Sequence, residues 1–83
     1  MANTSPNIVA LMEHVAKALV EKTGEVFVEP FDEKGETVIE LEVAESDVGR
    51  LIGRQGRMAR SLRTIVKSAS LRTKKRYQLE ILE

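Results

Sequence analysis

The chain has 83 residues, of which 42% are apolar, and it contains no cysteine. A chain of this length forms one small domain with a single core, and the absence of cysteine excludes disulfides and thiolate metal sites. The net charge is zero, but residues 1–49 carry 3 basic and 11 acidic residues whereas residues 50–83 carry 10 basic and 2 acidic ones. The second half therefore offers a local positive field that attracts polyanions.

The first predicted element is an amphipathic helix. Ser5 is a favourable N-cap and Pro6 suits the first helical position. Apolar residues then recur at helical spacing up to about Lys22: Ile8, Leu11, Met12, Val15 and Leu19. Gly24 is the residue predicted to stop the helix. Residues 1–5 are expected to be disordered, and residues 6–83 to form the single domain.

Two strands are predicted next. Residues 25–29 alternate and are ended by Pro30, residues 32–36 form a polar turn, and residues 37–43 form the second strand. On the second strand Ile39, Leu41 and Val43 point inward. The outward face of the complete sheet is expected to be acidic with a few apolar side chains: Glu25, Glu29, Glu40, Glu42, Glu80, Phe27, Val38 and Leu82.

The second half predicts two helices and a closing strand. Ser46 and Asp47 begin a short helix that Gly53 breaks, and residues 57–70 form an amphipathic helix. Its apolar face carries Met58, Leu62, Ile65 and Ala69, and its other face carries Arg57, Arg60, Arg63 and Lys67. A basic loop precedes a last strand marked by Tyr77, Leu79 and Ile81. The order α-β-β-α-α-β predicts an α+β fold, with three helices on one face of a three-stranded mixed sheet.

The stretch GRLIGRQGRMARSLR, residues 49–63, lies at the junction of these two helices. Gly53 and Gly56 allow positive φ and close approach of another backbone. The second helix begins at the second glycine, where free N–H groups and the helix dipole favour an anion. Arg54 and Gln55 can reach phosphate or sugar oxygens from the tip of the loop. The pattern indicates a loop that binds a phosphate backbone.

Together with the element order, IGRQGR between two helices resembles the GXXG segment of a KH domain of the type II, prokaryotic arrangement. A single-domain chain of this size is similar to the bacterial KhpA family. The resemblance implies that Gly53, Arg54, Gln55 and Gly56 clamp about four nucleotides of single-stranded RNA. It implies a rim and an aliphatic floor made by five more residues: Arg57, Arg60, Ile52, Gly49 and Val48. The position where many KH domains place a bulky aliphatic residue is Ala59 here.

The resemblance further implies a cytoplasmic post-transcriptional regulator or RNA chaperone. It implies association of the chain with itself and with a larger RNA-binding protein of the KhpB (Jag) type. The residues alone do not specify the preferred RNA sequence, and they do not assign Arg63, Lys67 or the basic residues between 72 and 76 to RNA contact.

Two alternatives stay open from the residues themselves. One is a helix-turn-helix DNA-binding protein with residues 57–70 in the major groove, although this helix begins without the Asn or Gln that reads adenine. The other is a small protein-interaction module that dimerises through Phe27, Val38 and Leu82.

No enzyme, metal or cofactor is expected. His14 is the only histidine, and the glycine loop lacks the Lys-Ser/Thr of a nucleotide-binding P-loop. No membrane-spanning stretch or signal peptide is expected either.

Overall fold

The computed structural model describes residues 8–82. The predicted N-cap at Ser5 and Pro6 and the predicted disorder of residues 1–5 lie outside this range. The elements in chain order are α1 (Ile8–Leu19), a short 3-10 helix η1 (Thr23–Glu25), β1 (Phe27–Glu33), β2 (Glu36–Glu42), α2 (Glu45–Thr73) and β3 (Tyr77–Ile81).

The three strands form one mixed sheet in the order β1-β2-β3. β1 and β2 are antiparallel, and β2 and β3 are parallel. A tight turn at Lys34 and Gly35, with φ of 50° and 82°, joins the antiparallel pair, as a two-residue hairpin requires. A parallel pair needs a longer crossover, and α2 provides it. The predicted α+β fold is thereby confirmed.

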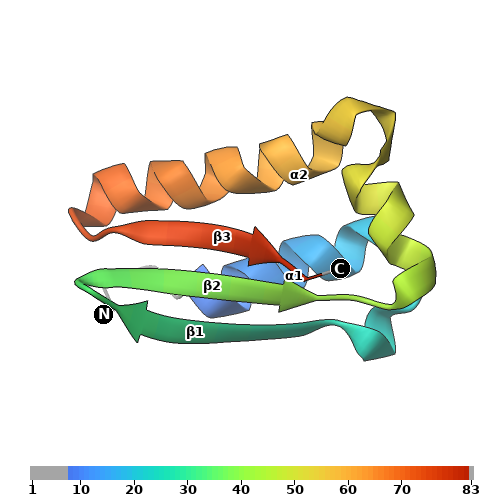
Figure 1. The fold of residues 1–83 in the computed structure, drawn as a ribbon, viewed down its shortest axis with the longest axis horizontal. Helices are drawn as coiled ribbons and strands as arrows, with labels where there is room; N and C mark the ends of the chain where they lie inside the picture. The colour runs from blue at the N-terminus through green and yellow to red at the C-terminus, as the bar shows by residue number, and fades with distance from the viewer. Residues whose placement is uncertain (1–7, 83) are drawn as a thin grey trace.

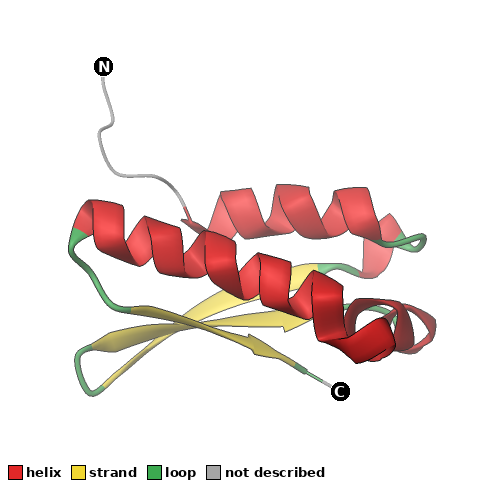
Figure 2. Ribbon diagram, turned by 90° about the horizontal axis from the view of Figure 1, so that it is seen from above, coloured by secondary structure: helices red, strands yellow, loops and turns green. Residues whose placement is uncertain are grey.

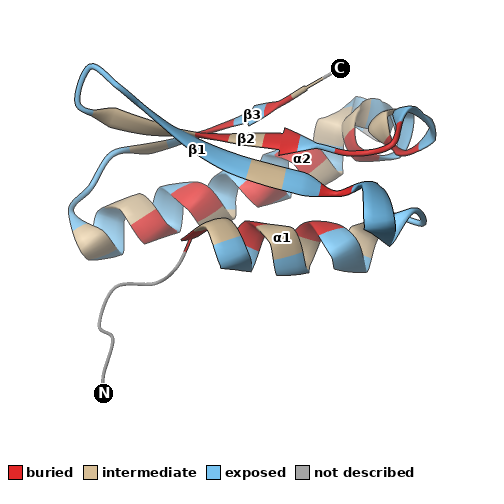
Figure 3. Cartoon of the chain, turned by 90° about the horizontal axis from the view of Figure 1, so that it is seen from below, coloured by how far each residue is buried: buried red, intermediate tan, exposed pale blue. Residues whose placement is uncertain are grey.

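The helices cover one face of the sheet, which leaves the other face open to solvent (Figure 2). Alternation in β2 turns Ile39 and Leu41 toward the helices, where both are fully buried. They meet the apolar faces of α1 and α2, and buried positions of both helices lie toward the sheet (Figure 3). Leu79 and Ile81, which mark the predicted closing strand, lie in β3 and complete this core.

Helix α1 ends earlier than the sequence predicts. Its last residue is Leu19, and Gly24 belongs to η1 instead of stopping the helix. The reason lies far along the chain, because the backbone N–H groups of Glu21 and Lys22 donate to the carboxylate of Asp47.

Pro30 does not end the first strand as predicted. It lies in the middle of β1, opposite Ile39 of β2. β1 is at the edge of the sheet, and an edge strand tolerates a residue that has no N–H because only alternate residues bond to the neighbouring strand. The strands consequently run further toward the turn than predicted.

The outer face of the sheet is acidic in the described residues. Glu29 lies opposite Glu40, which lies beside Glu80, so three carboxylates form one row across the sheet. Phe27 and Phe31 on β1 are exposed. Glu25, predicted for this face, lies in η1 rather than in a strand.

Candidate nucleic-acid interface

The predicted loop at residues 53–56 is a break inside α2. The whole range is assigned as helix, yet Gln55 and Gly56 have φ of 66° and 67°. These left-handed residues turn the chain, and α2 changes direction between its two segments (Figure 1). The break differs in detail from the prediction. Gly53 stays helical and has no positive φ, whereas Gln55 takes the left-handed conformation.

Arg60 stabilises this break from the following turn. One of its terminal nitrogens donates to the carbonyl oxygen of Gln55 at 2.7 Å. A left-handed conformation is unfavourable for a residue that carries a Cβ, and this bond helps to hold Gln55 in it. The guanidinium has five N–H donors, so Arg60 keeps donors for a ligand.

The two remaining glycines of the segment have free space around them. A Cβ built on Gly49 or Gly53 would meet nothing within 4 Å. Neither glycine is therefore needed for packing within the chain. Their small size leaves room for a ligand backbone to approach the helix closely.

The residues predicted to form the aliphatic floor lie in the first segment of α2. Val48 and Ile52 are half-buried and pack against the core with part of their surface left accessible. Ala59 is 3% exposed and belongs to the core itself. The aliphatic surface beside the loop therefore comes from the first segment of α2.

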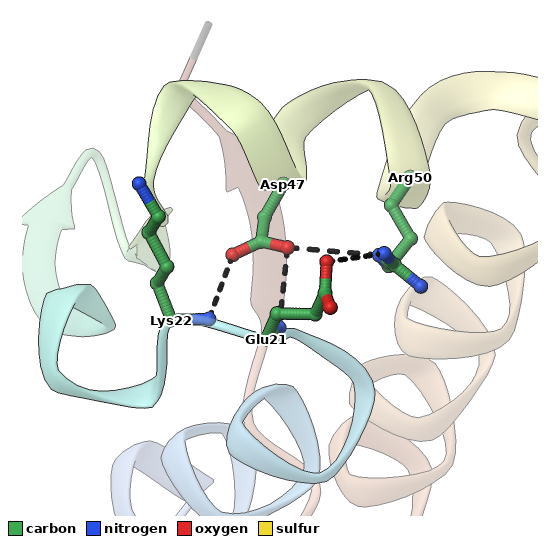
Figure 4. Close-up of polar contacts among 4 residues, drawn as sticks. All are labelled: Glu21, Lys22, Asp47 and Arg50. Carbon is green, nitrogen blue, oxygen red and sulfur yellow. Dashed lines mark hydrogen bonds and ion pairs between the residues drawn. The ribbon is translucent and has the colours of Figure 1, made fainter.

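Asp47 holds this first segment in place, a role the sequence does not reveal. Its carboxylate accepts hydrogen bonds from the N–H of Lys22 at 3.1 Å and of Glu21 at 3.2 Å (Figure 4). The Nε atom of Arg50 lies 3.6 Å away. The bond from Lys22, and then those from Glu21 and the charge of Arg50, lower the pKa of Asp47, against the opposing effect of burial. These contacts therefore hold the residues that follow α1 against the first segment of α2, which carries Val48, Gly49 and Ile52.

The side chain of Arg50 takes part in these contacts around Asp47. Its guanidinium pairs with Glu21 at 2.7 Å. The basic surface beyond the loop consists instead of exposed side chains on the second segment of α2: Arg57, Arg60, Arg63 and Lys67. No acidic residue occurs between positions 48 and 79, so this strip keeps its positive field.

The strip leads into a groove of about 660 Å³ between α2 and β3. The sequence pattern does not predict this groove, because it forms only when β3 packs beside α2, the element that precedes it in the chain. Its walls combine basic and apolar side chains: Arg63, Val66, Lys67, Ser70, Leu71, Lys75, Arg76, Tyr77, Gln78 and Leu79, with Glu36 at one side.

Among residues 8–82 no cluster of three or more His, Cys, Asp or Glu side chains is arranged to hold a metal ion. Within the same residues, no helix combines the length and the apolar character that crossing a membrane demands.

The element order, the mixed sheet and the glycine break between two helical segments define a domain of the KH type. The family model described as "KhpA/KhpB, KH domain" matches residues 9–81. The chain belongs to this family.

Curated relatives match over nearly the whole chain. RNA-binding protein KhpA of Borreliella burgdorferi is 43% identical over 77 residues, which cover 93% of this chain and 94% of the relative. RNA-binding protein KhpA of Treponema pallidum is 41% identical, covering 88% and 91% of the two chains. The protein of the same name from Caldanaerobacter subterraneus is 44% identical, covering 87% and 96%. No solved structure matches the chain significantly.

Proposed function

We propose that this chain is a single-stranded RNA-binding protein that grips about four nucleotides of backbone at residues 53–56. The observation that carries the proposal is the left-handed break at Gln55 and Gly56, set between two helical segments and followed by exposed arginines. Membership of the KhpA/KhpB family and relatives named RNA-binding protein support it.

The loop binds phosphate through position and charge. The second segment of α2 begins at the break, so the positive end of its helix dipole lies there and favours an anion. Arg54 and Gln55 follow Gly53, whose missing Cβ lets the phosphate backbone approach. Arg57 and Arg60 extend the positive surface over the next turn, while Val48, Gly49 and Ile52 support the bases.

From the loop the strand runs along α2 toward the groove beside β3. Arg63 and Lys67 line this groove and continue the basic strip, so we include them among the RNA contacts. The acidic row on the outer face of the sheet repels phosphate and restricts RNA to the helical side.

The finer biological assignments also belong to this proposal. They are a cytoplasmic regulator or RNA chaperone without catalytic activity, which pairs with itself or with a larger KhpB (Jag)-type protein. Phe27, Val38 and Leu82 on the outer face are the surface we assign to self-association, because Phe27 is 57% exposed. Two linked grooves bind one RNA with a higher effective affinity. Sedimentation of the wild type and of Phe27→Ser tests this surface, and equal masses for the two proteins refute it.

Fluorescence anisotropy tests the RNA proposal. Wild type and an Arg54→Asp, Gln55→Asp variant are titrated with a short single-stranded RNA, its DNA equivalent and a duplex. We expect preferential single-strand binding that the variant loses. Three to four phosphate contacts predict a slope of log affinity against log salt of roughly −2 to −3.

The alternatives predict different results. A helix-turn-helix protein prefers duplex DNA, and a protein-interaction module binds none of the three nucleic acids. Unchanged RNA binding in the loop variant would place the contact elsewhere on the basic surface and refute the loop mechanism.

A further inference from the structure

One aromatic side chain lines the groove between α2 and β3. Among the described residues that line it, Tyr77 is the only one with an aromatic ring. The ring is half-buried, since Tyr77 packs against the core while lining the groove. Leu71 lines the same groove from α2 and is 73% exposed, the most exposed large apolar side chain in the described range.

The backbone of Tyr77 is fixed on both sides. Its N–H donates to the Oγ of Ser70 at 2.9 Å, and the Ser70 hydroxyl donates back to the carbonyl oxygen of Tyr77 at 3.4 Å. The carbonyl of the preceding residue, Arg76, accepts a bond of 2.8 Å from the N–H of Thr37. Tyr77 is therefore anchored to α2, and its neighbour to β2. A ring on such a backbone loses little freedom when a ligand binds.

The chemistry around the ring suits a nucleotide. Arg63, Lys67, Lys75 and Arg76 line the groove, against the single acid Glu36 among the described lining residues. A flat apolar surface with cations around it matches a base and its phosphates, since aromatic side chains stack on bases while a positive groove follows the backbone.

We propose that Tyr77 forms a stacking subsite for one unpaired base of the bound strand and favours a purine there, because the larger ring system overlaps more of the tyrosine. This inference rests on the proposed function, since the strand reaches the groove from the loop. Gly56 and Ser70 are 14 residues apart, a rise of about 21 Å along α2. Tyr77 is thus a second contact, separate from the phosphate clamp.

The wild-type protein offers a direct probe. Tyr77 is the only tyrosine and the chain has no tryptophan, so intrinsic fluorescence reports on this one ring. We expect a single-stranded RNA of adenines to quench the emission. The same RNA with one abasic nucleotide, moved along the strand, should quench at every position except one. Equal quenching by every abasic RNA would overturn the subsite.

Substitutions supply the second measurement. Tyr77→Phe keeps the ring and should bind RNA as the wild type does, whereas Tyr77→Leu should bind at least about tenfold more weakly. Phe31→Leu is the matched control, because it removes an exposed aromatic ring outside the groove, and it should leave RNA affinity unchanged. Circular dichroism verifies that each variant is folded; should Tyr77→Leu not fold, the abasic series on the wild type decides alone.

The outcomes separate this inference from the function on which it rests. If the wild type binds RNA and folded Tyr77→Leu binds it equally well, the stacking subsite is wrong and the loop mechanism stands. If the wild type binds no single-stranded RNA, the proposed function fails and the subsite fails with it.

Discussion

Alanine substitution at the two glycines of the loop should affect stability in opposite directions. Gly56 has φ of 67°, a conformation that L residues rarely adopt. Gly53 lies within the helical assignment without positive φ, and an added Cβ would meet nothing within 4 Å. The two positions are only three residues apart, so each substitution serves as the control for the other.

The magnitudes follow from these conformations. A left-handed residue with a Cβ costs about 1–2 kcal/mol, partly offset because alanine reduces the entropy of the unfolded chain by about 0.4–1 kcal/mol. Gly56→Ala should therefore lower the free energy of unfolding by about 1 kcal/mol, or about 4–8 °C in Tm. Gly53→Ala should raise it by about 0.5–1 kcal/mol through helix propensity.

Thermal and urea unfolding followed by circular dichroism measures both variants. Equal shifts in the same direction would refute the assignment of the left-handed turn to Gln55 and Gly56. RNA anisotropy on Gly53→Ala then separates stability from binding. Because the free protein has space for the methyl group, weaker binding by this more stable variant would mean that the ligand itself occupies that space. Unchanged binding would contradict a close approach of RNA to Gly53.

Three further predictions concern the loop and its support. Gln55→Gly should raise the free energy of unfolding by about 0.5 kcal/mol in urea titrations, since glycine removes the left-handed strain. Asp47→Asn should be less stable than the wild type at pH 7. The folded-state pKa of Asp47 lies below the ordinary value of 3.8. The ionised carboxylate therefore stabilises the fold above that pH, and this stabilisation is lost as the pH falls through the lower, folded-state pKa. The urea midpoints at pH 7 and pH 3 should consequently differ less for the variant than for the wild type. Glu21→Gln should change the free energy of unfolding by less than about 0.5 kcal/mol, because the Glu21 side chain is 76% exposed; a loss as large as that of Asp47→Asn would contradict this.

Local patterns in the sequence were sufficient to predict the elements that form the core. Alternation identified Ile39, Leu41 and Val43 as inward positions, and all three are buried. Glycines and arginines at residues 53–57 indicated a turn between helices. These signals depend on neighbours within a few residues, which is the range that periodicity and turn chemistry describe.

Features that depend on distant partners were missed or placed wrongly. Pro30 is acceptable in β1 only because that strand lies at the sheet edge, and the strand order is not visible in a local pattern. Asp47 reads as a helix-start residue, but its bonding partners are the N–H groups of Glu21 and Lys22 about 25 residues earlier. The groove that contains Tyr77 exists only after β3 packs beside α2.

The central claim is that single-stranded RNA binds along one path, from the loop to the groove between α2 and β3. A titration of ¹⁵N-labelled protein with short single-stranded RNA, followed through backbone amide chemical shifts, tests it most directly. We predict the largest changes at Gly53, Gly56 and residues 63–77, with the amides of Glu29 and Glu40 on the outer face unaffected. Changes centred on the outer face, with none at Gly53 or Gly56, would contradict the account.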